Sequence, residues 1–181
     1  MKASDYQIII IGAGVVGLAV ARALAEKGKQ SVLIIDRETG FGRGISGRNS
    51  EVIHSGIYYP QNTLKSKYCI KGRDLLYQYC ASNNVFHQKC GKIIIADEYQ
   101  EEALMNLFHL GESKNLGALK LLSKKEISHH EPNINGVIGL LIESTGIIDA
   151  HGLMSSFYQR SNSSDHDYLF QSTILGCKKT Q

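Results

Sequence analysis

The chain has 181 residues, of which 43% are apolar, enough to bury the core of one domain or of one domain and part of a second. Its 20 basic and 17 acidic residues give a net charge of +3, a balance too even to indicate a nucleic-acid partner or a membrane-binding tail. The spacing of the four cysteines matches neither a zinc ribbon nor a CxxC redox pair, so we expect reduced thiols.

The first element is a short apolar run over Gln7–Ile11, which is typical of a parallel strand buried on both faces. Gly12 and Gly14 interrupt this run at once, so it is too short for a membrane span or for the apolar region of a signal peptide. We therefore expect a cytoplasmic protein without a membrane span, or a mitochondrial one if a targeting segment precedes the chain.

The next segments predict a strand–helix–strand unit. Small and apolar residues recur every three or four positions over Val15–Lys27, which predicts a helix that lies flat on a sheet. Gly28 ends that helix, and Ser31–Ile35 predicts a second buried strand. This order predicts an α/β fold with a Rossmann-like βαβ unit and a parallel sheet.

A glycine-rich segment over Gly40–Ser50 predicts a loop that surrounds a ligand. A helix capped by Asn62 or Thr63 should follow and pack through one apolar stripe, with two small cysteines beside it in the core. The stripe comprises Leu64, Tyr68, Leu75, Leu76 and Tyr79, and the two cysteines are Cys69 and Cys80.

The remaining sequence predicts part of a second, α+β substrate domain. Strands are expected over Lys92–Ala96, Gly136–Glu143 and Phe170–Leu175, and helices over Tyr99–Glu112, Ser123–His130 and Ala150–Arg160. Residues 161–167 are polar and predict a loop. We expect an FAD-binding portion over residues 1–87, a partial substrate domain over 88–160 and a strand returning to the FAD-binding portion over 161–181.

A GxGxxG motif carries the first functional signal. Gly12 allows the tight bend, Gly14 lets the backbone approach a pyrophosphate, and Gly17 lets the helix pack closely on the strand. Asp36 ends the second strand, where its carboxylate can accept hydrogen bonds from a ribose diol. We include Val16 among the predicted cofactor contacts. The alternative is a glycine turn without a ligand, and the motif alone does not separate FAD from NAD.

The segment after the loop carries a resemblance to a known family. The residues that carry it are Ser46–Pro60, with Leu64 and Lys65, and further on Cys90–Ile93 and Gly146–Asp149. At these positions the chain resembles FAD-dependent oxidoreductases of the D-amino-acid oxidase type, and among them the L-2-hydroxyglutarate dehydrogenases. Such enzymes are at least roughly twice this length, so the chain corresponds to their N-terminal part.

The resemblance implies FAD as cofactor and oxidation of L-2-hydroxyglutarate to 2-oxoglutarate, with a hydride passing from C2 to flavin N5 and on to an electron acceptor. It implies that the His54–Gly56 turn approaches the flavin ring. Further FAD contacts are expected from the loop, from the residue after Asp36 and from the last strand. These are Ser46, Arg48, Asn49, Ser50, Arg37 and Ile174.

Removal of a hydride from C2 also requires that the hydroxyl proton leaves, so the site should contain a base. We predict His54 in this role, because histidine titrates near neutral pH. The alternative is that His54 only hydrogen-bonds the loop or the flavin. Arg48 is expected to contact a phosphate or a substrate carboxylate. The adjacent His129 and His130 do not face the same way on a helix, and we predict no metal site.

Other functions stay open at this point. The same fold hosts oxidation of an amino acid, an amine or glycerol 3-phosphate. A nucleotide-binding fragment without catalysis is a second alternative, and an NAD-dependent dehydrogenase fits poorly because it leaves the Gly40–Ser50 loop without a role. The predicted partners are a small 2-hydroxy acid and an electron acceptor.

Overall fold

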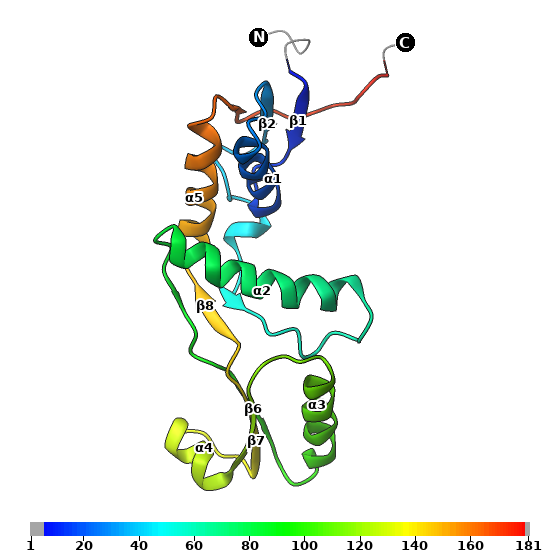
Figure 1. Cartoon of the computed structure of the whole chain (residues 1–181), viewed down its shortest axis with the longest axis vertical. Coiled ribbons are helices and arrows are strands. Elements are labelled where there is room, and N and C mark those ends of the chain that lie inside the picture. The colour runs from blue at the N-terminus through cyan, green and yellow to red at the C-terminus, as the bar shows by residue number, and fades with distance from the viewer. Residues whose placement is uncertain (1–5, 180–181) are drawn as a thin grey trace. The chain divides into compact units, whose positions relative to one another are not determined.

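The computed structural model describes residues 6–179 and divides into two compact units (Figure 1). The first unit contains the described residues up to Ser50 and those from Asp149 onward, and the second contains Glu51–Ile148. These limits differ from the expected domains 1–87, 88–160 and 161–181, and that division stays a prediction.

A parallel three-stranded sheet forms the first unit, in the order β1-β2-β9. Its strands are β1 (Ile8–Ile11), β2 (Val32–Ile35) and β9 (Asp167–Leu169). Ile8 pairs with Val32, and Leu33 pairs with Asp167, both in parallel register. The expected parallel sheet of a βαβ unit is therefore confirmed.

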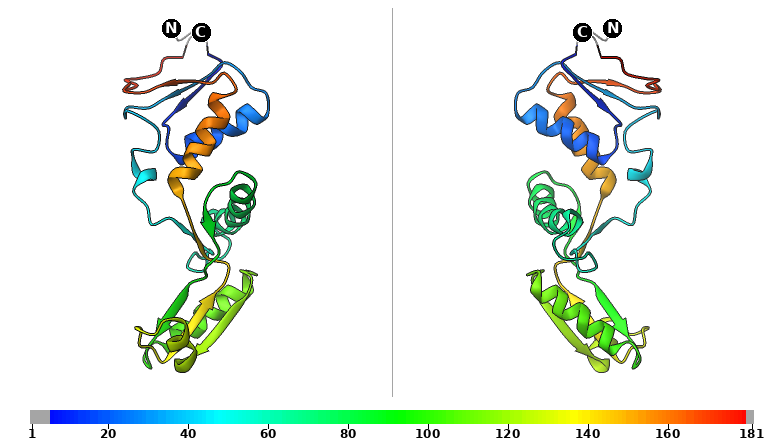
Figure 2. Two further views of the ribbon diagram at one scale, coloured as in Figure 1. Left: turned by 90° about the vertical axis from the view of Figure 1, so that its left-hand side faces the viewer. Right: turned by 90° about the vertical axis from the view of Figure 1, so that its right-hand side faces the viewer.

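Two helices of the first unit, α1 (Val15–Glu26) and α5 (Ala150–Asn162), pack against each other, and they are the blue and orange ribbons that lie together in both views of Figure 2. A core between the sheet and α1 buries Ala13, Ala21, Val32 and Ile34. A short 3-10 turn, η2 (Ile45–Gly47), lies in the glycine-rich loop. The unit thus brings a segment from the end of the chain onto the first βαβ unit.

The second unit contains two antiparallel sheets. One has the order β3-β8-β4, with β3 (Val52–Ile53), β8 (Gly146–Ile148) and β4 (His87–Gln88). The other has the order β5-β7-β6, with β5 (Ile93–Ala96), β7 (Ile138–Ile142) and β6 (Leu119–Ser123). Its helices are α2 (Leu64–Ser82), α3 (Glu101–Ser113) and α4 (Lys124–His130).

The main core of the second unit joins α3 to one face of the β5-β7-β6 sheet. Leu104 of α3 is buried together with Ala96, Leu140 and Ile142 of the sheet. Ile57, from the turn that precedes α2, is buried in the same cluster. The turn that contains His54 is therefore attached to this core through Ile57, three residues after His54.

Two expectations about the elements were wrong. β1 is not buried on both faces, because it is an edge strand of the described sheet and leaves Ile11 73% exposed. The last strand is not Phe170–Leu175 but β9, because Gln171 adopts a left-handed φ of 54° through which a strand does not continue. Strands β3, β4, β6 and β8 were not expected at all.

The apolar stripe predicted for α2 was also wrong. Leu64, Tyr68 and Leu75 are each more than half exposed, and the buried residues of the helix are Ser66, Arg73 and Cys80. The contact face is set by Arg73, whose Nη1 donates to the carbonyl oxygen of Leu116 at 3.0 Å. Cys80 is a core residue as predicted, whereas Cys69 is only partly buried.

Candidate functional site

The glycine turn joins β1 to α1 in the first unit. Gly12 has a φ of +103°, and the space where its side chain would lie is open for 4 Å within the described part of the chain. Its N–H donates to the carbonyl oxygen of Ile35 at 2.8 Å, which ties the turn to β2. A side chain at this position would be strained, so the bend requires glycine.

Gly17 fixes how closely α1 approaches the turn. A Cβ atom built at Gly17 would lie 1.9 Å from the carbonyl oxygen of Gly12, a backbone atom that cannot move aside alone. The helix therefore lies closer to the turn than any other residue would allow.

The start of α1 is arranged to receive an anion. Gly14 is the N-cap residue and has no side chain to cap the helix, so the helix dipole and first-turn N–H groups point out of the helix end. Ser46 of η2 lies beside this end, where its Oγ accepts a hydrogen bond of 3.0 Å from the Val15 N–H. A Cβ at Gly14 would come within 2.9 Å of the same Oγ. Gly14 and Ser46 are thus brought together, as a phosphate site requires.

A cavity of about 270 Å³ lies at the carboxyl ends of β1 and β2. It brings together four of the predicted site residues, namely Gly12, Asp36, Arg37 and Ile174. The Asp36 carboxylate accepts from the N–H of Ala13 at 2.6 Å and from that of Glu38 at 2.9 Å, which fixes its orientation. Carboxylate oxygens keep further lone pairs, so Asp36 can still accept from a ribose.

The other predicted contacts of the first unit are exposed. Val16 is 73% exposed on α1. Arg48, Asn49 and Ser50 are exposed after η2, where the Asn49 side-chain amide donates to the carbonyl oxygen of Ser46 at 2.7 Å. The guanidinium of Arg37 lies 3.5 Å from the carboxylate of Glu38. Of this group, Asn49 is the residue whose bond stabilises the loop around Ser46.

His54 lies in the second unit, directly after β3, and its side chain is exposed. The next residues, Ser55, Gly56 and Ile57, are buried. The carbonyl oxygen of His54 accepts from the Cys69 thiol of α2 at 3.5 Å, and burial raises the pKa of that thiol despite nearby cations. The backbone of this turn is therefore packed while the imidazole remains accessible.

Lys114, which follows α3, stabilises the turn from inside. Its ammonium donates to the carbonyl oxygens of Gly56 at 3.3 Å, of Ile57 at 3.0 Å and of Tyr59. Burial lowers the pKa of Lys114, and the nearby Cys69 opposes that shift. All three N–H donors of the ammonium are thus used on the turn.

The two tyrosines of the turn each lie under a lysine. Lys92 Nζ donates to the Tyr58 hydroxyl at 3.1 Å and lies 4.6 Å from the centre of the Tyr58 ring. Lys65 Nζ lies 4.5 Å from the centre of the Tyr59 ring. These cation–π contacts orient both rings.

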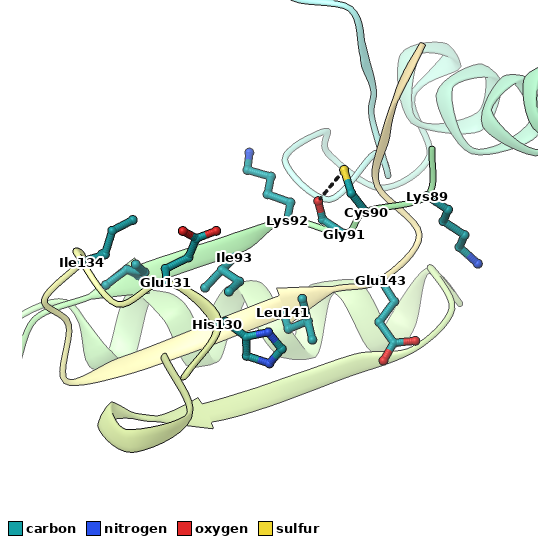
Figure 3. Close-up of a pocket in the computed structure, with 11 residues that line it drawn as sticks. Lys89, Cys90, Gly91, Lys92, Ile93, His130, Glu131, Ile134, Leu141 and Glu143 are labelled. Carbon is teal, nitrogen blue, oxygen red and sulfur yellow. Dashed lines mark hydrogen bonds between the residues drawn. The ribbon is translucent and has the colours of Figure 1, made fainter. Parts of the chain in front are cut away.

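Two cavities of the second unit have Lys92 in their lining, and the smaller one adjoins this turn. One of about 10 Å³ is lined by His54, Tyr58, Lys92 and Thr145, among others. The other, of about 650 Å³, opens over β5 and β7, and Figure 3 shows Ile93 and Leu141 at its floor with charged residues around them. Lys92 lines both cavities.

Sequence reasoning missed Lys114, Lys92 and Thr145. Lys114 reaches Tyr59 across 55 positions of the chain and Lys92 reaches Tyr58 across 34, so no local pattern joins them. Lys92 belongs to the segment Cys90–Ile93, which carries the resemblance to the family. That resemblance is the feature of the sequence that could have identified Lys92.

The residues present fit the FAD expected at this site. The open space at Gly12, the glycine-capped start of α1 and the carboxylate of Asp36 supply a bend, an anion site and a diol acceptor within one unit. Within residues 6–179, no group of three or more His, Cys, Asp and Glu side chains could hold a metal ion. In the same residues, no helix is long and apolar enough to cross a membrane.

The family profile of FAD dependent oxidoreductases (DAO) matches residues 7–181. The chain belongs to this family of enzymes, whose cofactor is FAD.

Among curated proteins, the chain is similar to the mitochondrial L-2-hydroxyglutarate dehydrogenase of Arabidopsis thaliana, with 46% identity over 154 residues. It is 37% identical over 158 residues to the mitochondrial L-2-hydroxyglutarate dehydrogenase of Homo sapiens. The two matches cover 84% and 86% of this chain but only 32% and 34% of the relatives. The chain thus spans about a third of the length of these enzymes.

Solved structures show the same fold. The FAD-bound L-alpha-glycerophosphate oxidase of Mycoplasma pneumoniae matches with a TM-score of 0.87 and 27% identity, over 93% of this chain and 45% of that one. The glycine oxidase of Bacillus cereus matches with a TM-score of 0.85 and 19% identity, over 97% of this chain and 50% of that one. The second match, at its low identity, supports the fold alone.

Proposed function

We propose that the protein to which this chain belongs oxidises L-2-hydroxyglutarate to 2-oxoglutarate and passes the electrons to an acceptor. The observation that carries this proposal is the 46% identity with an enzyme of that name, across 84% of this chain. Because both curated relatives quoted above are named as mitochondrial, we propose the same location for this protein.

In this proposal the first unit holds the nucleotide part of FAD. Gly12 and Gly14 give room for the pyrophosphate, the first turn of α1 donates N–H groups to it, and Ser46 contacts it from the loop. Asp36 accepts from the ribose in the cavity that Arg37 and Ile174 also line. Gly17 holds α1 in place, and the exposed Val16, Arg48, Asn49 and Ser50 are the remaining contacts.

In the second unit, His54 is the proposed base. When bound, FAD supplies the acceptor for the hydride that leaves C2. His54 takes the hydroxyl proton, which leaves the product as a ketone. The accessible imidazole on a packed backbone supports this role, because a base must reach its proton from a fixed position.

Oxidation of glycerol 3-phosphate is the second candidate, favoured by the TM-score of 0.87 to a glycerophosphate oxidase. A substrate panel on the FAD-loaded chain, with an acceptor dye, separates the two. We expect dye reduction with L-2-hydroxyglutarate and neither with its D enantiomer nor with glycerol 3-phosphate. Reduction with glycerol 3-phosphate alone would overturn the proposal.

His54→Gln tests the base. General-base catalysis contributes about 10²–10⁴-fold, so we expect a rate lowered by about a hundredfold or more and the loss of the acidic limb of the pH–rate profile. Bound FAD, measured by its absorption, should be unchanged. An unaltered pH–rate profile would show that another group is the base.

A further inference from the structure

Lys92 occupies a position that the proposed reaction does not yet use. It lines both the small cavity that contains His54 and the larger one of about 650 Å³ over β5 and β7. Lys92 lies directly before the start of β5, and Figure 3 shows its side chain pointing away from Ile93 and Leu141 at the floor of the larger cavity. A group bound at this ammonium would therefore lie beside the proposed base, because His54 lines the same small cavity.

The Lys92 ammonium is held and still has donors to offer. One donor is used on the Tyr58 hydroxyl at 3.1 Å, and the Tyr58 ring lies under the charge at 4.6 Å. An ammonium carries three N–H donors, so two remain for another acceptor. The contact with Tyr58 already restricts the Lys92 side chain. On binding an anion, Lys92 therefore loses less conformational freedom than an unrestrained lysine would.

The other lysines of this region do not offer the same combination. Lys114 uses its donors on three carbonyl oxygens of the turn. Lys65 lies over Tyr59 in a similar way but lines neither cavity. Among the described residues that line the small cavity, Lys92 is the one Lys or Arg.

A second, independent observation points to a ligand at the same place. Thr145 also lines the small cavity and is only 3% exposed. Its hydroxyl has no hydrogen-bond partner within residues 6–179, although a buried polar group without a partner costs about 1–3 kcal/mol. The cavity measures about 10 Å³, close to the space of one water-sized probe. A single oxygen atom of a ligand that entered it would satisfy this hydroxyl.

We propose that Lys92 is a specificity-determining residue that binds a carboxylate of a dicarboxylic 2-hydroxy acid, with the Thr145 hydroxyl as a second donor. The assignment rests on the proposed function, because it takes His54 as the base beside which the substrate lies. It predicts selection of a diacid over the corresponding monoacid, since the monoacid leaves one carboxylate contact unmade.

The test is an NMR titration of the full 181-residue chain with glutarate and with butyrate, as diacid and monoacid probes. We expect the glutarate affinity to fall about tenfold in Lys92→Met, as for the loss of a charged hydrogen bond, and to be largely kept in Lys92→Arg. Lys65→Met is the matched control, because it removes the other lysine that lies over a tyrosine. We expect it to change the affinity less than about twofold.

Three results would overturn the assignment: no binding of glutarate by the unaltered chain, equal affinity in Lys92→Met, or an equal loss in Lys65→Met. FAD uptake, measured separately by flavin absorption, tests the proposed function independently of the assignment of Lys92. If FAD binds and Lys92→Met has no effect, the assignment of Lys92 fails while the proposed function stands. If glutarate binding depends on Lys92 but FAD is not taken up, the carboxylate site at Lys92 stands, whereas the flavin proposal fails and with it the role of Lys92 in substrate selection.

Discussion

The glycine turn of the first unit and the His54–Pro60 turn of the second are stabilised in different ways. The glycine turn depends on the absence of side chains at Gly12, Gly14 and Gly17. The second turn depends on side chains far away in the sequence, above all Lys114. Added atoms should therefore damage the first turn, and removed atoms the second.

The largest effect is expected from Gly17→Val. Its Cβ would lie 1.9 Å from the Gly12 carbonyl oxygen, so α1 has to move from the sheet, at a cost of about 3 kcal/mol or more. Urea unfolding followed by circular dichroism measures the loss. Gly72→Ala is the control, because Gly72 lies within α2 with open space around it, and there alanine should stabilise by about 1 kcal/mol. Equal effects of the two changes would contradict the close packing of α1.

A smaller effect is expected from Lys114→Met, which keeps the length of the side chain and removes its donors. Three carbonyl oxygens of the turn lose their partner, so stability should fall by about 2 kcal/mol in the same unfolding experiment. Lys71→Met, at an exposed position of α2, should change the free energy of unfolding by no more than about 0.5 kcal/mol. If Lys114→Met is as stable as Lys71→Met, the turn is not held by this lysine.

Asp36→Ala removes a side chain from the first unit, at the cavity where the ribose is proposed to bind. We expect FAD affinity to fall about tenfold through the loss of a charged acceptor for the ribose. Glu38→Ala removes a carboxylate two residues on that does not line the cavity, and should change the affinity less than about twofold. Fluorescence titration with FAD measures both, and equal affinities would remove Asp36 from the site.

The smallest effect concerns α4, which belongs to neither turn. The hydrogen bond from Lys120, with those from the Ser123 backbone and hydroxyl, lowers the pKa of Glu126 from 4.5 to about 2. The stabilisation is therefore present above pH 4.5 and is lost as the pH falls through about 2. Glu126→Gln should flatten the acid dependence of stability in this window, while the exposed Glu98→Gln should leave it unchanged. An unchanged slope in Glu126→Gln would contradict this capping arrangement.

The difference between the two turns also explains what the sequence could predict. Gly12, Gly14 and Gly17 express local backbone requirements, so their spacing, together with the apolar runs and the helical periodicity on either side, predicted the βαβ unit. Lys114 and Thr145 reach the second turn only through the packing of the β5-β7-β6 and β3-β8-β4 sheets, which no local pattern encodes.

Errors in the predicted elements have the same origin. Periodicity placed the apolar stripe of α2 toward a core, but the Arg73 bond to Leu116 selects another face. The apolar residues of Phe170–Leu175 predicted a strand, whereas pairing with β2 ends at Leu169 and the backbone turns at Gln171. In both places a single distant contact or dihedral angle outweighed a pattern of side chains.

The most direct test of the account is an FAD titration of the 181-residue chain beside its Gly14→Val variant, with circular dichroism to verify that both fold. We predict near-stoichiometric FAD in the unaltered chain and an affinity lowered by about a hundredfold in Gly14→Val, whose side chain takes the space of the pyrophosphate. A folded chain that takes up no FAD, or a Gly14→Val variant that binds it equally well, would contradict the binding of FAD at the glycine turn.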